Sequence, residues 1–121
     1  MKIPFSSSER STLGIEWELM LVDRATRELV SGAEEVLPAI TPPGEEEHPF
    51  AKHELFQSTI EVVTGINGTV RDATADLSRT IEAISAEADR RGLDLLCAGT
   101  HPFTDWQTQS ISPGPRYEKL V

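Results

Sequence analysis

The strongest constraint on this chain is an apolar run that carries two carboxylates on alternate positions, Gly14-Ile15-Glu16-Trp17-Glu18. Residues 13–22 are apolar at nearly every position apart from the two glutamates, which predicts a long strand with residues 13, 15, 17, 19 and 21 on its core face. Because successive side chains of a strand leave on opposite faces, Glu16 and Glu18 are expected on the same face, about 7 Å apart. Their like charges need compensation, and a hard divalent cation that prefers oxygen ligands is the obvious candidate.

Two further carboxylates, Glu54 and Glu61, fall in residues 50–64, a second extended segment that we expect to break around residues 57–58. Glutamates in such apolar surroundings are costly to bury unless they are paired or bound to metal. One interpretation is that all four glutamates converge on one sheet face, raise one another's pKa and share a cation. The other is that they simply form the solvated face of an antiparallel sheet.

One long helix is predicted from a cap at Thr69 to about Arg91, because small and aliphatic residues recur there at intervals of three and four. Gly92 follows as a natural residue for ending a helix. The fold class is therefore α+β, a mainly antiparallel sheet with this helix packed on it through Leu77, Ile81 and Ile84. The sequence predicts one domain over residues 1–121.

The remaining segments are assigned from composition. Residues 28–30 could return as the second arm of a hairpin, and residues 93–98 are predicted to form a short buried strand. Residues 38–49 hold four of the eight prolines and are expected to form a flexible surface loop. Residues 116–121 resemble the opening of a helix.

The charge balance restricts the partners of this chain. It carries 20 acidic against 11 basic residues, a formal charge of −9, which argues against nucleic acid as a partner. Cys97 is the only cysteine, so no intrachain disulfide is possible, which fits a cytoplasmic protein. We find no signal-peptide core and no apolar run long enough to span a membrane, and we expect no membrane partner. Neither the P-loop nor the dinucleotide glycine pattern occurs.

Two single residues remain as candidates for a site. His101 follows the predicted strand at residues 93–98 and could bind a ligand, although a histidine held by backbone hydrogen bonds is the alternative explanation. Arg116 could hold a nucleotide or substrate, or it could form only a surface ion pair.

Taken together, the ordered blocks resemble the carboxylate-amine ligases of the glutamate-cysteine ligase type 2 family, which is related to glutamine synthetase. The resemblance rests on residues 13–23, on Glu54 through Thr64, on Gly99-Thr100-His101-Pro102 and on Arg116-Tyr117. It implies the N-terminal part of a glutamine synthetase-like catalytic fold. It also implies an ATP-dependent ligase that joins glutamate, or a similar carboxylate, to cysteine or another amine through an acyl-phosphate, as in glutathione-like thiol biosynthesis.

The resemblance also implies roles for individual residues. Glu18, Glu54 and Glu61 would hold one Mg²⁺ or Mn²⁺, and Glu16 would help to hold another that bridges the phosphates of ATP. Substrate or nucleotide contacts would come from His101, Arg116 and Tyr117.

The chain departs from the family in length, since members are far longer and supply further ligands after the Arg116-Tyr117 block. We therefore expect this chain alone to be inactive as a ligase. Its sheet would be completed by the missing C-terminal part or by a homo-oligomer. The alternative is a truncated, non-catalytic relative that acts as a metal-binding or assembly module.

Overall fold

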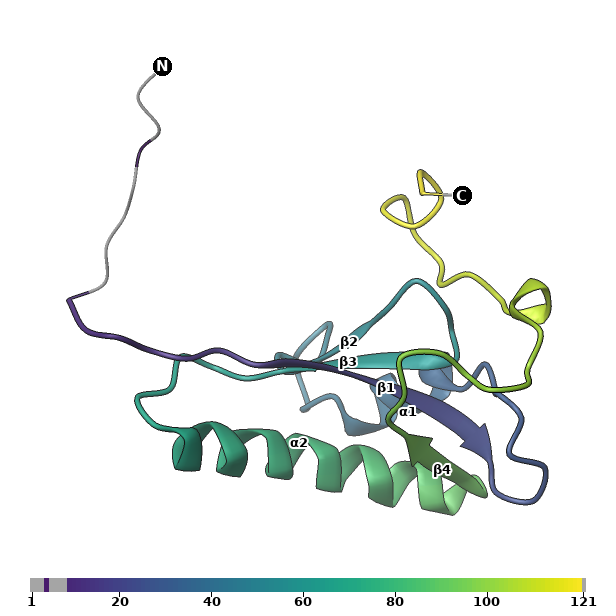
Figure 1. The fold of residues 1–121 in the computed structure, drawn as a ribbon, viewed down its shortest axis with the longest axis horizontal. Helices are drawn as coiled ribbons and strands as arrows, with labels where there is room; N and C mark the ends of the chain where they lie inside the picture. The colour runs from purple at the N-terminus through teal and green to yellow at the C-terminus, as the bar shows by residue number, and fades with distance from the viewer. Residues whose placement is uncertain (1–3, 5–8, 121) are drawn as a thin grey trace.

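An antiparallel sheet of four strands carries the fold, in the spatial order β2-β3-β1-β4 (Figure 1). The computed structural model describes residue 4 and residues 9–120. The strands are β1 (Glu16–Asp23), β2 (Ala51–His53), β3 (Thr59–Val63) and β4 (Leu93–Leu96). The helices are α1 (Ala33–Ile40), α2 (Val70–Arg90) and the short 3₁₀ turn η1 (Trp106–Thr108).

Strand β1 lies inside the sheet and pairs with β3 on one side and β4 on the other. The predicted strand at residues 13–22 is therefore confirmed, although regular pairing begins at Glu16 and Leu13 forms only an isolated bridge with Asn67. The extended segment at residues 50–64 breaks as predicted, into β2 and β3, and all three strand pairs are antiparallel. The α+β class is confirmed to this extent.

Helix α2 covers one face of the sheet along most of its length (Figure 1). Its N-cap is the predicted Thr69, whose hydroxyl accepts a hydrogen bond of 3.2 Å from the Asp72 N–H. Gly92 follows the helix with φ 71°, the left-handed conformation that glycine adopts without a steric penalty. Ile84 is completely buried against the sheet, and Leu77 and Ile81 pack beside it, as predicted. No helix in the described part of the chain is long and apolar enough to cross a membrane.

One local prediction was wrong, and a second is confirmed only over a short stretch. Residues 33–40 form helix α1, so the predicted loop at residues 38–49 begins too early, and Pro38 lies inside the helix. Ala33, Val36 and Leu37 are buried on one side of α1, and this tertiary packing outweighs the local preference of proline. Residues 28–30 do return beside β1 as predicted, through an antiparallel bridge between Val22 and Leu29 and hydrogen bonds from the Asp23 N–H to the Glu28 carbonyl and from the Val30 N–H to the Leu21 carbonyl, but they form no regular strand.

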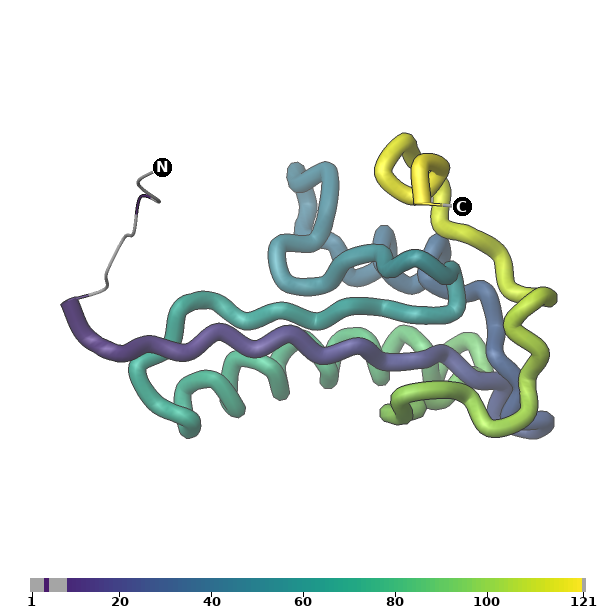
Figure 2. Tube along the Cα trace, turned by 45° about the horizontal axis from the view of Figure 1, so that its top comes forward, coloured from purple at the N-terminus to yellow at the C-terminus, as the bar shows by residue number. Residues whose placement is uncertain are grey.

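The C-terminal segment passes around the end of the sheet at the connection between β2 and β3 and continues on the side away from α2 (Figures 1 and 2). Residues 115–120 form turns instead of the predicted opening of a helix, and Val121 lies outside the described residues. We call residues 109–118 the strap, because they run back along the connection between β2 and β3. This placement, rather than a helix, brings Arg116 and Tyr117 toward the sheet.

Candidate functional site

Strand alternation separates the two faces of the sheet by chemistry. Leu19 opposes Ile60 on the face that packs against α2, and both are buried. Trp17 opposes Val62 on the same side but is 38% exposed, so the predicted core face of β1 is fully buried only from Leu19 onward. The alternate positions of β1 and β3 therefore point the other way, where Glu18 lies directly opposite Glu61. We call the carboxylates of Glu16, Glu18, Glu54 and Glu61 the acidic face.

Glu61 is the carboxylate of the acidic face whose pKa is altered by its surroundings. Burial raises the pKa of Glu61, and the charges of Glu16 and Glu54 raise it further. Lys52 and Arg116 act on the same carboxyl in the opposite direction. Glu61 is thus the centre of the acidic face, with like charges on two neighbouring segments and two cations at its border.

The donor set suits a hard cation in kind, because all four groups supply carboxylate oxygens, the ligands that Mg²⁺ and Mn²⁺ prefer. The separations between these side chains, however, do not form a complete cation site. Across residue 4 and residues 9–120, no three His, Cys, Asp or Glu side chains are close enough to hold one ion. The predicted convergence therefore stops at a shared face with Glu18 opposite Glu61. The physical reason is that Glu16 and Glu18 are exposed and that their like charges repel one another.

The strap is held to the connection between β2 and β3 by hydrogen bonds on both sides. The Gln57 N–H donates to the Ser110 carbonyl over 2.9 Å, and the Ser112 N–H donates to the Leu55 carbonyl over 2.8 Å. The buried Ser58 hydroxyl donates to the Gln109 side-chain oxygen over 2.7 Å. These bonds extend the open face beyond the four strands.

Tyr117 anchors the end of the strap. Its side chain is buried, and its hydroxyl donates a hydrogen bond of 2.7 Å to the backbone carbonyl of His53, at the end of β2. The Arg116 guanidinium lies over the Tyr117 ring at 5.6 Å, a cation–π contact that orients an otherwise exposed side chain. Burial raises the pKa of the Tyr117 phenol. Of the predicted Arg116-Tyr117 pair, Arg116 is exposed and could contact a ligand, whereas the Tyr117 hydroxyl is already hydrogen-bonded within the chain.

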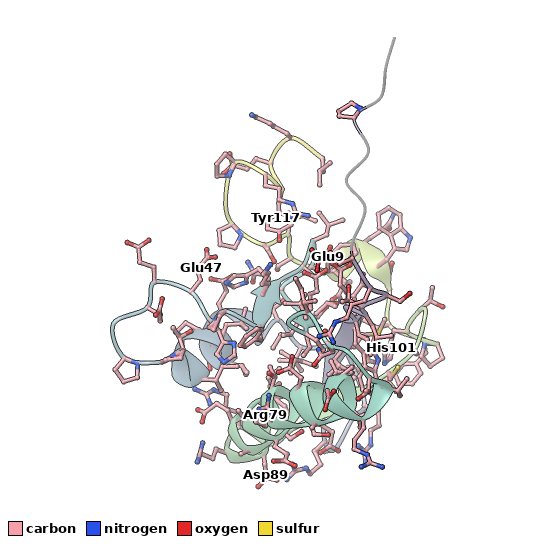
Figure 3. All side chains as sticks on the ribbon, turned by 90° about the vertical axis from the view of Figure 1, so that its left-hand side faces the viewer. Glu9, Glu47, Arg79, Asp89, His101 and Tyr117 are labelled. Carbon is pink, nitrogen blue, oxygen red and sulfur yellow. The ribbon has the colours of Figure 1, made fainter. Side chains whose placement is uncertain are left out.

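His101 is placed away from this centre, on the β1 and β4 side of the sheet. Its Nδ1 accepts a hydrogen bond of 3.0 Å from the Thr104 N–H, so Nε2 carries the proton and donates to the Arg27 carbonyl at 2.9 Å. Figure 3 shows His101 toward one side of the molecule and Glu47 toward the other, with Tyr117 between them. The structure therefore supports the backbone-held alternative, and it does not bring His101 together with the acidic face.

Lys52 is a residue that the sequence pattern did not single out. It lies directly opposite Glu61 in the β2–β3 register, so Lys52, Glu61 and Glu18 form one row across three strands. Lys52 and Arg116 both line a cavity of about 310 Å³ beside the β2 edge. The available signal was its position two residues before Glu54, which places the two side chains on one face of an extended segment.

Comparison with known proteins gives a consistent result. Residues 12–121 match the glutamate-cysteine ligase family 2 (GCS2). A Frankia alni protein named "putative glutamate–cysteine ligase 2-1" is 52% identical over 122 residues, which cover 100% of this chain and 32% of that protein. A Thermobifida fusca protein named "putative glutamate–cysteine ligase 2" is 49% identical over 124 residues, covering 100% of this chain and 31% of the relative. The chain thus spans about a third of the length of these curated relatives.

Proposed function

Because the chain belongs to glutamate-cysteine ligase family 2 and corresponds to the N-terminal portion of its relatives, we propose that it forms part of the active site of an ATP-dependent carboxylate-amine ligase. The substrates are glutamate, or a similar carboxylate, and cysteine or another amine. A cytoplasmic location follows from the same proposal, as does a place in thiol biosynthesis.

The proposed reaction has two steps. A carboxylate oxygen of the acid substrate attacks the γ-phosphorus of ATP, and the bond from that phosphorus to the β-phosphate oxygen breaks. The products of this step are ADP and an acyl-phosphate. The amine nitrogen then attacks the acyl carbon, inorganic phosphate leaves with the bonding electrons, and the amine loses a proton. Both steps depend on positioning and on stabilising negative charge.

The single observation that best supports this proposal is the row formed by Glu18, Glu61 and Lys52 on the open face of the sheet. Glu18, Glu54 and Glu61 would hold one Mg²⁺ or Mn²⁺ only after their side chains move closer together than they lie in this structure, and Glu16 would help to hold a second. Such ions supply neutralisation of phosphate charge when they are bound. The chain's own part is to present these carboxylates on one face of the sheet.

The proposal is tested by titrating MgCl₂ or MnCl₂ into the 121-residue chain and following its thermal unfolding. A cation that binds only the folded state stabilises it by about 2.7 kcal/mol when its concentration is 100 times the dissociation constant. We expect a rise in melting temperature for the wild type and none for the double variant Glu18→Gln, Glu61→Gln.

The matched control is Glu82→Gln, Glu118→Gln, which removes two exposed carboxylates outside the acidic face. It is expected to retain the full cation-induced shift. An unchanged wild-type melting temperature, or equal shifts in the two double variants, would contradict the proposed cation site.

Catalysis is proposed for a longer assembly than this chain. Strands β2 and β4 are the edges of the described sheet, and a further part of the polypeptide or a second copy would complete it. We expect no glutamate-dependent and cysteine-dependent release of ADP from the 121-residue chain alone. Turnover by the isolated chain that Glu18→Ala abolishes would show that its site is already complete. Cation binding with no activity, even after completion, would instead favour the non-catalytic metal-binding or assembly module.

A further inference from the structure

The two outer strands of the sheet differ in how their free edges are occupied. On β2, the Val63 N–H donates to the Phe50 carbonyl over 2.9 Å, so by alternation the backbone groups of His53 point away from β3. The Tyr117 hydroxyl of the strap already donates to the His53 carbonyl there. The strap therefore contacts the β2 edge, whereas β4 is the last strand on the other side of the sheet (Figure 1).

The free edge of β4 presents backbone groups that could pair with one more strand. The Arg24 N–H donates to the Gly92 carbonyl over 3.0 Å, which directs the backbone of every second residue from Gly92 onward toward β1. The residues between them, Leu93, Leu95 and Cys97, therefore direct their N–H and carbonyl groups outward. Of these outward groups, only the Leu93 carbonyl receives a hydrogen bond from the described residues, and its donor is the Arg24 guanidinium. An unpaired edge of this kind is a template for another strand.

A groove of about 880 Å³ borders β4. Its lining comes from β4, from the last turns of α2 and from the loop at residues 101–103. Phe103 of that loop lines the groove and is 57% exposed. On α2, the exposed residues Ser85 and Ala86 have small side chains, which leave room for a neighbouring element beside the helix. Exposed apolar surface next to an unpaired strand edge is typical of a protein interface.

The acidic and basic side chains that line this groove balance one another. Arg24 pairs with Asp89 at 2.7 Å and with Asp94 at 3.0 Å. Arg27 pairs with Asp94 at 2.5 Å. Two arginines and two aspartates make this surface formally neutral, in a chain whose net charge is −9. Two copies of an acidic chain can therefore meet here without local repulsion, whereas a basic partner would gain no attraction from a neutral groove.

We propose that the β4 edge binds the β4 edge of a second copy of this chain, in an antiparallel pair related by a two-fold axis. Such pairing is self-complementary, because every outward residue offers one donor and one acceptor. With the axis at Leu95, this residue bonds to its own counterpart, and Leu93 bonds to Cys97 of the partner subunit. The dimer joins two four-stranded sheets into one continuous sheet. The inference goes beyond the proposed function, because it requires neither ligase chemistry nor a bound cation.

The alternative occupant of this edge is a strand from elsewhere in a longer polypeptide, since this chain spans only 32% of the Frankia alni relative. The two occupants have different consequences for the 121-residue chain. A second copy requires association that rises with the concentration of this chain alone and that protects the Leu95 amide hydrogen. A strand that this chain does not supply leaves it monomeric, with the β4 edge unpaired.

The experiment combines sedimentation equilibrium of the 121-residue chain, over a roughly hundredfold range of concentration, with amide hydrogen exchange at both ends of that range. We expect the average mass to rise from that of one chain toward that of two. The Leu95 amide is expected to exchange about tenfold or more slowly in the concentrated sample, because it becomes hydrogen-bonded only in the dimer. The Asp94 amide, which faces β1 in either state, is the internal reference.

Two pairs of variants separate this interface from association through other surfaces. Ala86→Lys places a long charged side chain in the groove of each copy and is expected to weaken association about tenfold or more. Ala75→Lys is its matched control, because Ala75 is an exposed alanine about three turns away on the same helix and does not line the groove. Phe103→Asp tests the loop side of the groove and is expected to weaken association to a similar degree. Its control is Trp106→Asp, which replaces an exposed aromatic residue outside the groove.

A mass that stays at one chain over the whole range would overturn the proposal and favour the alternative occupant. So would association that Ala86→Lys and Phe103→Asp leave unchanged, or exchange of the Leu95 amide that does not respond to concentration. Added NaCl should strengthen the dimer, because it screens the repulsion between two chains of charge −9, and weakening by salt would contradict a charge-balanced interface. Failure here leaves the proposed function intact, since a monomeric chain can bind Mg²⁺ at the acidic face and a dimeric chain can lack that site.

Discussion

The two faces of the sheet follow opposite rules although they share the same strands. The face against α2 buries Leu21, Ile60 and Val62 almost completely, and its contribution is burial of apolar surface. The open face places Glu18 opposite Glu61, an arrangement that opposes folding until something compensates the charge. Because side chains alternate along a strand, one face can stabilise the fold while the other keeps a destabilising set of groups for binding.

The largest expected effect comes from truncating a buried side chain on the face that α2 covers. Ile84→Ala is expected to lower the free energy of unfolding by about 2–5 kcal/mol, because it leaves a cavity between α2 and the sheet. If this variant does not fold, Ile84→Val should show a graded loss of about 0.5–1.5 kcal/mol. Urea unfolding measures both. The exposed Ser78→Ala on α2 serves as control, and a loss there as large as that of Ile84→Ala would refute the assignment of the core.

A carboxylate outside the acidic face should behave in the opposite way to Glu61. Asp76 accepts hydrogen bonds from the Gly65 N–H at 2.8 Å and from Asn67, and it pairs with Arg79 at 2.8 Å. Asp76→Ala is expected to cost about 1–3 kcal/mol at pH 7. Arg79→Ala, which removes only an exposed partner, should cost less than about 1 kcal/mol.

The pH dependence of Asp76 gives a sharper version of this prediction. The Gly65 N–H is the main reason that the pKa of Asp76 lies below its usual value. Its contribution is therefore complete above the pKa of the unfolded chain, about 3.9, and is lost as the pH falls through the lower folded value. The difference between wild type and Asp76→Ala should shrink in acid. A difference that grows in acid would contradict the hydrogen-bond assignment.

His101 tests whether the resemblance or the geometry describes its role. Its ring joins the Arg27 carbonyl and the Thr104 N–H, so His101→Ala should cost about 1 kcal/mol in urea unfolding. Binding of Mg²⁺ and of L-glutamate should be unchanged in the folded variant. If the variant is as stable as the wild type but no longer binds one of these ligands, His101 belongs to the binding site after all.

The smallest expected effect has the opposite sign. In EDTA at pH 7, Glu61→Gln should raise the free energy of unfolding by roughly 0.2–1 kcal/mol, because it removes like-charge repulsion on the open face. The pKa of Glu61 is raised in the folded state, so ionised Glu61 opposes folding at high pH and the gain should vanish below about pH 4. Glu82→Gln is the control. Destabilisation by Glu61→Gln at pH 7 without metal would show that the acidic face is already compensated.

Much of the fold could be predicted from local pattern. The period of α2, its cap at Thr69 and its end at Gly92 were all readable, because capping and periodicity involve residues that are neighbours in sequence. Helix α1 was not, since Pro38 argues against a helix and only packing of Val36 and Leu37 supports it. The return at residues 28–30 could be predicted from the polar turn before it, which is again a local signal.

The candidate site also has features that the sequence predicts and features that only the tertiary structure decides. Alternation within β1 is enough to place Glu16 and Glu18 on one face, because it is a property of a single strand. Only strand register sets Lys52 and Glu18 on either side of Glu61, and only the fold of the strap carries Arg116 above β2 on the anchored Tyr117 ring. Those relations join residues tens of positions apart. They depend on long-range pairing and burial, which no local pattern in the sequence encodes.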